Sequence, residues 1–417
     1  MTGPPSGGER VVLVHIYFPV DKMKEDLAEF EELALSAGAH IVATVTGTRR
    51  VPDSKYFVGS GKAEEVRDVV AAHQAQLVIF NHVLTPAQER NLERLIKCRV
   101  LNRTGLILDI FAKRARSFEG KLQVELAQLN HLASRLVRIW THLERQRGGI
   151  GLRGPGETQL EADKRLIRSK IKLITARLIK LRHQREMGRR ARKKATVPTV
   201  ALVGYTNAGK STLFNQLTGA TVYVANQLFA TLDPTLRRID FPEMGPVILA
   251  DTVGFIRHLP HDLVDAFHAT LEEVAEANLL LHVVDAHDEQ RDAHIAAVDQ
   301  VLAVIQAEHV PRIMVYNKID LMIPAMQPAI YRDENHQIKR VFISAHKSWG
   351  MAELVKAIAE ILEKDMIEQR VTLTPMQAKL RAHLYARDAV ITEKIDEEGN
   401  YHLVVRMPRV ELEKLFR

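Results

Sequence analysis

The chain has 417 residues, which is enough for roughly two to four domains. It carries 58 Lys or Arg and 51 Asp or Glu residues, a formal net charge of +7. Its single cysteine, Cys98, excludes a disulfide within one copy of the chain and is typical of a reducing cytosol. Residues 1–10 contain no apolar signal core, and no stretch approaches the roughly 20 apolar residues that cross a bilayer. We therefore expect a cytoplasmic, monomeric protein without integral membrane association.

The positive charge is concentrated in one part of the chain. Residues 111–197 hold 23 Lys or Arg and 7 Asp or Glu residues, a net charge of +16, so the remaining residues together carry −9. A basic segment between two mildly acidic ones indicates a nucleic-acid contact surface.

Residues 1–112 alternate apolar runs with amphipathic ones, which predicts a small N-terminal α/β domain with a parallel sheet. Within this domain, Gly59-Ser-Gly-Lys62 is similar to a phosphate loop but lacks the full spacing. The expected strands are Val11–Tyr17, His40–Thr46, Gln76–Phe80 and Arg99–Leu101, and the expected helices are Lys22–Ser36, Lys62–His73 and Pro86–Lys97.

Residues 113–196 show a different pattern, in which apolar residues recur every three or four positions along two segments. Such seams predict two helices packed as an antiparallel hairpin, joined by a loop at Arg147–Thr158 that contains five glycines. A charged hairpin without further core is either a contact surface for a partner or a solvated spacer. The seam residues are Leu122, Leu126, Leu129, Ala133, Leu136, Trp140 and Leu143, followed by Leu160, Ile167, Ile171, Ile174, Leu178 and Leu181.

Residues 204–211 read Gly-Tyr-Thr-Asn-Ala-Gly-Lys-Ser and match the phosphate-loop pattern G-x-x-x-x-G-K-[ST]. The apolar run Pro198–Val203 predicts a buried strand before the loop, and Ser211–Thr218 predicts a helix after it that ends at Gly219. A helix N-terminus directs backbone N–H groups at an anion. Lys210 would reach the β and γ phosphates of a nucleotide, and Ser211 would ligate Mg²⁺. The candidate contacts are Gly204, Tyr205, Thr206, Asn207, Ala208, Gly209, Lys210 and Ser211.

The motif Asn317-Lys-Ile-Asp320 predicts that the base is guanine. The Asp320 carboxylate can accept both the N1–H and the 2-amino hydrogens of guanine, whereas adenine would leave a buried carboxylate unsatisfied. We expect Asn317 and Lys318 to brace the loop and cover the base. A backbone N–H of Ser344-Ala345, which follows the expected strand Lys339–Ile343, would donate to guanine O6. The candidate base-site residues are Asn317, Lys318, Ile319, Asp320, Ser344, Ala345 and His346.

Two further segments of the predicted GTPase domain, residues 197–364, fit contacts to the γ-phosphate. Asp251 ends the expected strand Pro246–Ala250 and would hold Mg²⁺ through water, and the N–H of Gly254 would touch the γ-phosphate. Thr231 is the candidate for the second hydroxyl on Mg²⁺, with Thr235 as its rival. The candidate residues are Phe229, Ala230, Thr231, Leu232 and Asp233 in one segment, and Asp251, Thr252, Val253 and Gly254 in the other.

Together these motifs resemble the HflX family of translational GTPases over most of the chain. The resemblance rests on the phosphate loop, Leu228–Pro234, Asp251–Arg257, Asn317–Asp320 and, as its most family-specific part, Gly148–Leu160. It implies a GTPase that binds the large ribosomal subunit and splits or rescues stalled or idle ribosomes, with hydrolysis as the release step. It also permits a second, ATP-binding activity in the N-terminal domain.

The residue after Gly254 is Phe255, where many GTPases carry a glutamine that orients the attacking water. Phenylalanine cannot orient water by hydrogen bonding. We therefore expect slow hydrolysis by the isolated protein, with Lys210 and Gly254 as catalytic groups, and stimulation by ribosomes. A potassium ion beside Asn207 is another way to stabilise developing charge. Alternatively, Asn207 is a loop residue that tolerates left-handed backbone geometry.

The glycine-rich tip is the expected RNA contact of the hairpin, because glycine lets a backbone approach RNA closely and arginine pairs with phosphate or stacks on bases. The resemblance implies that this tip approaches the peptidyl-transferase region. An RNA-modification enzyme timed by GTP and a GTP-gated scaffold for a protein partner are the alternative functions. The candidate RNA contacts are Arg147, Gly149, Gly151, Arg153, Gly154 and Gly156.

Residues 365–417 predict a small C-terminal α+β domain whose role no motif indicates. Pro375–Tyr385 is expected to be helical, Ala389–Ile395 and Tyr401–Met407 are expected to form a hairpin, and Arg409–Phe416 could close the domain with a helix.

Overall fold

A computed structural model of the chain describes residues 8–19, 27–140, 155–194, 197–219, 228–229, 231–241, 245–257, 268–324, 326–364, 366–385, 389–396, 398–408, 412 and 415. By its internal contacts the chain divides into two compact units. The first comprises Met1–Leu178, Ala225–Asp233 and His258–Phe267, and the second comprises Ile179–Val224, Pro234–Arg257 and His268–Arg417.

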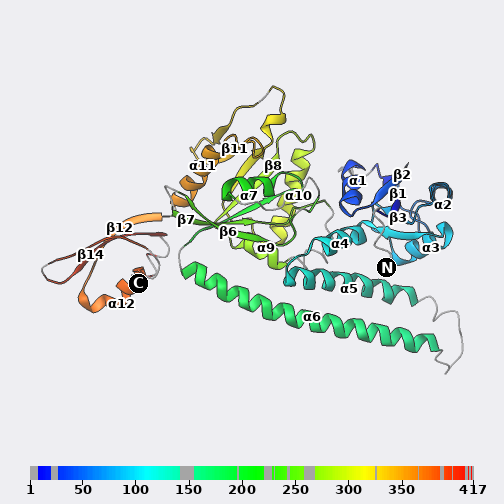
Figure 1. Cartoon of the computed structure of the whole chain (residues 1–417), viewed down its shortest axis with the longest axis horizontal. Coiled ribbons are helices and arrows are strands. Elements are labelled where there is room, and N and C mark those ends of the chain that lie inside the picture. Colours follow the sequence, from blue (N-terminus) through cyan, green and yellow to red (C-terminus); the bar gives the residue numbers. More distant parts are fainter. Residues whose placement is uncertain are drawn as a thin grey trace, which may run out of the picture. The chain divides into compact units, whose positions relative to one another are not determined.

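The first unit contains a four-stranded parallel sheet with strand order β2-β1-β3-β4, as the alternating pattern predicts (Figure 1). Its inner strand β3 reads Leu-Val-Ile-Phe and is buried throughout, as expected for a parallel sheet that helices cover on both faces. Helix α3 begins with a capping box in which Thr85 and Gln88 bond each other's backbone N–H groups. The elements are β1 (Arg10–Tyr17), α1 (Leu27–Ser36), β2 (His40–Thr48), α2 (Ser60–His73), β3 (Leu77–Phe80), α3 (Pro86–Ile96) and β4 (Arg99–Asn102).

Three helices follow this sheet: α4 (Arg103–Arg114), α5 (Phe118–Trp140) and α6 (Pro155–Lys194). The sequence did not predict α4, whose N-terminus is capped by Asn102 accepting a hydrogen bond from the N–H of Gly105 at 2.8 Å. Along α5 and α6 the seam residues whose side chains are described are buried or half-buried, with Leu122 and Ile174 the most buried. By contrast, Leu166 and Leu173, outside the seam, are more than half exposed.

The prediction that a loop spans Arg147–Thr158 is wrong at the C-terminal end of that range. Helix α6 begins at Pro155, so Pro155–Thr158 are helical. Proline is favoured at the first helical position because its missing N–H would have no partner there and its fixed φ suits a helix. The rest of the predicted loop lies outside the described residues.

The second unit contains a seven-stranded sheet with strand order β10-β11-β9-β8-β5-β7-β6, flanked by helices (Figure 1). The pairs β10–β11 and β6–β7 are antiparallel and the other pairs are parallel. Its elements are β5 (Thr199–Gly204), α7 (Lys210–Thr218), β6 (Thr235–Phe241), β7 (Gly245–Asp251), α9 (His268–Ala275), β8 (Leu279–Asp285), α10 (Arg291–Val304), β9 (Arg312–Asn317), η1 (Ile319–Leu321), β10 (Ala329–Arg332), β11 (Ile338–Phe342) and α11 (Met351–Lys364).

Strand β5 lies between β7 and β8, so its carboxyl end is central in this sheet. Ligands of open α/β sheets bind at the carboxyl ends of the parallel strands. The phosphate loop follows β5, the Asp251 motif ends β7 and the Asn317 motif ends β9. The topology therefore brings the predicted nucleotide motifs to one edge of the sheet.

The C-terminal part of the second unit is an antiparallel sheet with strand order β12-β14-β13. The expected hairpin is confirmed as β13 (Val390–Ile395) and β14 (Tyr401–Pro408), and the expected helix as η2 (Pro375–Gln377) with α12 (Ala378–Tyr385). Strand β12 (Met366–Leu373) was not expected. The expected closing helix falls outside the described residues except for residues 412 and 415. Among the helices that the structure describes, none is long and apolar enough to span a membrane.

Candidate functional site

Two glycines allow the backbone path of the phosphate loop. Gly204 has φ +148° and Gly209 has φ +94°, where side chains are rare. A Cβ on Gly204 would lie 2.2 Å from the carbonyl oxygen of Val283, and one on Gly209 would lie 2.3 Å from Asn317 Nδ2. Both close approaches require glycine, so the loop cannot keep this path with other residues.

Lys210 is buried in the loop and already bonded to it. Its Nζ donates to the carbonyl oxygens of Gly204 and Tyr205, at 3.0 and 2.7 Å, and the residue is 6% exposed. Burial lowers the pKa of Lys210 to about 8, and the nearby Asp251 carboxylate partly offsets this effect. A bound phosphate would give the ammonium group a stronger partner than these carbonyls.

Ser211 and Asp251 form the pair that could hold a metal ion. The Ser211 hydroxyl donates to Asp251 Oδ2 at 3.0 Å, and Asp251 is fully buried. Hydroxyl and carboxylate oxygens suit Mg²⁺, which keeps several waters and bridges to phosphates. GTPases generally use Mg²⁺, and the oxygen donors here fit it. In the described part of the chain, no group of three or more His, Cys, Asp or Glu side chains forms a separate metal site.

The carboxylate expected to recognise the base has a buried oxygen with no partner among the described residues. Asp320 Oδ1 makes no hydrogen bond, although it is buried. Such an atom is costly unless a ligand satisfies it. The neighbouring Lys318 has a left-handed backbone (φ +65°), and its Nζ pairs with Asp285 Oδ2 at 2.7 Å. The orphaned oxygen fits a base that presents hydrogen-bond donors, as guanine does.

Asn317 braces two loops, as expected. Its Nδ2 donates to the Ala208 carbonyl of the phosphate loop, and its Oδ1 accepts from the N–H of Ala345, both at 2.9 Å. The N–H of Ser344 donates to the Trp349 carbonyl. Both N–H groups expected to serve guanine O6 are therefore used within the protein. The O6 contact would have to share one of these bonds or use the N–H of the next residue, the exposed His346.

The Asp251–Gly254 segment packs directly on the phosphate loop. The Thr252 hydroxyl donates to the Leu202 carbonyl at 2.6 Å, and Val253 is buried. A Cβ on Gly254 would lie 2.8 Å from Thr206 Cγ2 and 3.1 Å from Lys210 Nζ. Glycine is thus required at the position expected to touch the γ-phosphate.

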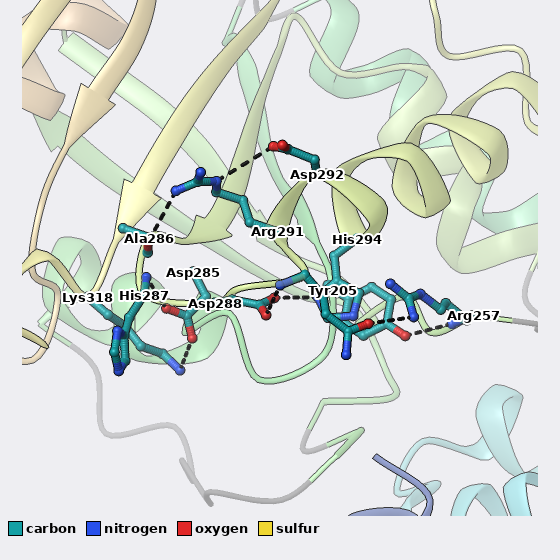
Figure 2. A network of polar contacts seen from close by, with 11 residues as sticks. Tyr205, Arg257, Asp285, Ala286, His287, Asp288, Arg291, Asp292, His294 and Lys318 are labelled. Carbon is teal, nitrogen blue, oxygen red and sulfur yellow. Dashed lines mark hydrogen bonds and ion pairs between the residues drawn. The ribbon is translucent and has the colours of Figure 1, made fainter. Parts of the chain in front are cut away.

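A polar network, which the sequence did not predict, extends the site toward α10 (Figure 2). The Tyr205 ring stacks on His294 with centroids 3.8 Å apart, and its hydroxyl accepts from the N–H of Arg257 at 2.9 Å. Arg257 Nη1 donates to Gln290 Oε1 at 2.8 Å, and His294 pairs with Asp288. The tyrosine at the second loop position was the only sequence signal for this network. The network joins the phosphate loop to the segment after Gly254.

The described residues of Leu228–Asp233 belong, by their contacts, to the first unit. Phe229 packs edge-on against Phe111 with centroids 4.7 Å apart, and Asp233 bonds to the start of α5. Leu232 is buried and Thr231 is half-buried. These partners differ from the nucleotide contacts expected for Phe229 and Asp233. Ala230 lies outside the described residues.

The remaining candidates are only partly described. Asn207 is exposed and has a left-handed backbone (φ +61°), which accounts for an asparagine without any ion. Gly156 lies in the first turn of α6. The other candidate RNA contacts, which are Arg147, Gly149, Gly151, Arg153 and Gly154, lie outside the described residues.

The fold is that of a P-loop GTPase: a glycine-containing phosphate loop follows the central strand β5, beside a hydroxyl–carboxylate pair whose oxygens suit Mg²⁺ and a buried Asp320 oxygen without a partner among the described residues. Comparison with known proteins agrees. The families described as GTP-binding GTPase N-terminal, GTP-binding GTPase Middle Region and 50S ribosome-binding GTPase match residues 24–112, 114–192 and 199–318.

Two relatives that align over most of their length are both named GTPase HflX. The GTPase HflX of Escherichia coli (strain K12) is 58% identical over 98% of this chain and 96% of its own length. That of Caldanaerobacter subterraneus subsp. tengcongensis is 47% identical over 94% of this chain and 89% of its own length. A crystal structure of SsGBP with GDP is 22% identical, with a TM-score of 0.48, over 85% of this chain and 99% of that one. The chain belongs to the HflX family of GTPases.

Proposed function

We propose that this GTPase binds the large ribosomal subunit in its GTP-bound state, splits stalled or idle ribosomes, and is released by GTP hydrolysis. The observation that supports RNA binding best is the surface of α6. Seven Lys and Arg side chains in the described part of α6 are exposed while its described seam residues are buried or half-buried, so the helix presents cations to solvent. One of them, Arg182, pairs with Glu272. The other six are Arg165, Arg168, Lys170, Lys172, Arg177 and Lys180.

The glycine-rich tip before α6 is the part we propose to enter the large subunit. Between Trp140 at the end of α5 and Pro155 at the start of α6 the sequence has fourteen residues with four glycines, more than the roughly 2–8 that a helix–helix connection needs. Arg147 and Arg153 would contact ribosomal RNA there. Splitting requires only that the GTP-bound protein fit the free large subunit better than the joined ribosome.

Hydrolysis in the isolated protein should be slow because Phe255 stands where many GTPases carry the glutamine that orients water. Phe255 is buried, so its side chain cannot serve the γ-phosphate. We propose that Lys210 and Gly254 stabilise the transition state and that the ribosome completes the site. A potassium ion beside Asn207 would further stabilise the charge that develops in the transition state. Exchange of KCl for NaCl at constant ionic strength tests the potassium ion separately. If GTP turnover does not change, potassium does not activate hydrolysis.

The test of ribosome dependence is GTP turnover with and without isolated large subunits. We expect strong stimulation for the parent protein and roughly tenfold less at limiting subunit concentration for the double variant Arg147→Ala/Arg153→Ala. A matched control is Arg50→Ala/Arg94→Ala, which removes two exposed arginines of the first unit. GTP turnover that does not change when large subunits are added would favour the two alternatives, an RNA-modification enzyme or a GTP-gated scaffold for a protein.

A second candidate function, ATP binding by the N-terminal domain, is favoured by one cavity in the first unit. This cavity of about 340 Å³ lies beside the N-terminus of α2. Arg49 and Lys62 line it, and a Cβ on Gly59 (φ +85°) would lie 1.9 Å from Arg49 Nη1, so a side chain there would displace the arginine. Binding of a fluorescent ATP analogue should survive Lys210→Ala and be lost on Lys62→Ala. The opposite pattern would assign the analogue to the GTP site.

A further inference from the structure

The segment Asp251–Arg257 lies along the phosphate loop, and both belong to the second unit. At the start of the segment, the Thr252 hydroxyl donates to a β5 carbonyl at 2.6 Å. Further along, the backbone of Phe255 makes two hydrogen bonds with the loop, at 2.8 and 3.1 Å. Gly254, whose N–H is expected to touch the γ-phosphate, lies between these contacts. The position of that N–H therefore depends on how firmly the whole segment is held.

A third contact holds the segment at Arg257, and it comes from a side chain of the phosphate loop. The Tyr205 hydroxyl accepts from the N–H of Arg257 at 2.9 Å, and both residues are buried (Figure 2). The guanidinium of Arg257 is bonded as well, because Nη1 donates to Gln290 Oε1 at 2.8 Å. The end of the segment is thus fastened to the phosphate loop by one bond and to the start of α10 by another.

The Tyr205 ring is held in the orientation that its hydroxyl contact needs. His294 of α10 stacks on it, with centroids 3.8 Å apart and ring planes at 17°. Asp288 pairs with that histidine through one carboxylate oxygen, and its other oxygen accepts from the N–H of Gln290 at 2.8 Å. The Tyr205 carbonyl accepts from Lys210 Nζ at 2.7 Å. Tyr205 therefore contacts the phosphate-binding lysine, the Asp251–Arg257 segment and α10.

We infer that Tyr205 is a positioning residue for GTP hydrolysis, whose hydroxyl fixes the end of the Asp251–Arg257 segment and so keeps the Gly254 N–H at the phosphate loop. The inference rests on the proposed role of Gly254 at the γ-phosphate. A Cβ on Gly254 would lie 3.1 Å from Lys210 Nζ, so the segment already lies close to that lysine. Donors that are fixed before the reaction stabilise a transition state without a cost of reorganisation.

Loss of the hydroxyl would penalise only the position of the segment that the structure shows, here called the closed position. In that position the Arg257 N–H is buried, and a buried donor that loses its acceptor is costly. The segment can avoid this cost by moving until the N–H meets water, but Gly254 would move with it. GTP requires the closed position, whereas GDP lacks the γ-phosphate and does not. The defect should therefore depend on the nucleotide.

The variant Tyr205→Phe removes the hydroxyl and keeps the ring. The rate of single-turnover hydrolysis at saturating GTP, and the affinity for a non-hydrolysable GTP analogue, should each fall about tenfold. GDP affinity should change less than twofold, because GDP binding does not need the closed position. The control is Tyr331→Phe, which removes the hydroxyl of an exposed tyrosine on β10 and should match the parent.

A second variant, Gln290→Ala, loosens the same anchor from its other side. It removes the acceptor of the Arg257 guanidinium and changes no residue of the phosphate loop. It should also lower turnover more than GDP affinity. Its control is Gln300→Ala, which removes an exposed side chain from the same helix. Hydrogen exchange at the Arg257 amide reports the Tyr205 contact directly and should speed up in Tyr205→Phe but not in Tyr331→Phe.

These readouts separate the inference from the function on which it rests. Faster exchange in Tyr205→Phe together with parent-like turnover would overturn the positioning role. Equal losses of affinity for the GTP analogue and for GDP would also overturn it, because Tyr205 would then support the loop as a whole. If Gly254→Ala hydrolysed GTP like the parent, the proposed role of Gly254 would fail. Exchange at Arg257 would still show whether the Tyr205 hydroxyl holds the segment.

Discussion

Phe255 and Tyr205 are joined by an isolated parallel β-bridge that extends the sheet into the nucleotide site. The N–H of Phe255 donates to the Gly204 carbonyl at 3.1 Å, and the Phe255 carbonyl accepts from the N–H of Thr206 at 2.8 Å. The Phe255 side chain is 1% exposed. The position at which many GTPases orient water is therefore a structural link here, and its side chain faces the interior.

Phe255→Gln should therefore fail to speed intrinsic hydrolysis. The glutamine side chain would enter the interior, where an unpaired amide costs roughly 1–3 kcal/mol in addition to the lost apolar contacts. We expect a lower melting temperature and basal GTP turnover no faster than that of the parent. Phe255→Leu is the control for lost volume. Faster basal turnover in Phe255→Gln would show that the side chain can reach the water.

Asp320→Asn should reverse the preference for the base. The orphaned Asp320 oxygen becomes part of an amide, which would present a donor where guanine also donates. Loss of two charge-assisted hydrogen bonds, at about 1.5–3 kcal/mol each, predicts GTP binding weaker by roughly 100-fold or more. Competition binding with GTP and xanthosine triphosphate measures this. Parent-like affinity for GTP would mean that another group recognises the base.

Gly254→Ala should impair hydrolysis more than GDP binding. The new Cβ would press on Thr206 and on Lys210 Nζ, so the segment would move away from the phosphate loop. Loss of one transition-state donor typically costs about 100-fold or more in turnover. Single-turnover hydrolysis and GDP titration measure the two effects. Equal losses in both would indicate that the loop itself has collapsed.

Lys210 predicts a pH dependence of nucleotide binding. Its pKa of about 8 in the nucleotide-free protein lies below the ordinary lysine value of 10.5. Phosphate binding requires the charged form, so GTP affinity should fall about fourfold between pH 7 and pH 8.5, with uptake of part of a proton on binding. Calorimetry in buffers of different ionisation enthalpy measures that uptake. Constant affinity with no proton uptake over this range would contradict the buried, partly neutral lysine.

The same shift affects the stability of the nucleotide-free protein. Between pH 8 and pH 10.5 the unfolded chain binds more protons at this lysine than the folded one does. The contribution of Lys210 to the free energy of unfolding therefore increases with pH in that window and is smallest below pH 8.

The sequence predicted those parts of the site whose residue spacing is set by the nucleotide. The loop at Gly204–Ser211 and the motif at Asn317–Asp320 each follow a strand, because phosphate and base contacts require a turn at a strand's carboxyl end. Local patterns also predicted the parallel sheet of the first unit. Both kinds of signal lie within short stretches of chain.

Features that depend on distant partners were not predictable. The apolar run in α4 is buried on most sides, so it lacks the one-sided periodicity that identifies a helix. Asp233 belongs to a motif typical of GTPases, but its partners at Arg116 and Ser117 precede it by more than a hundred residues. The link between Tyr205 and Arg257 is equally invisible in the local sequence. Such contacts are set by the tertiary fold.

The most direct test of the proposed function is sucrose-gradient sedimentation with ribosomes and with isolated subunits. With a non-hydrolysable GTP analogue, the protein should sediment with the large subunit and should convert joined ribosomes into subunits. With GDP, or in the Lys210→Ala variant, it should remain at the top of the gradient and leave ribosomes joined. Equal association in all nucleotide states, or none with the large subunit, would contradict a GTP-dependent ribosome-splitting role.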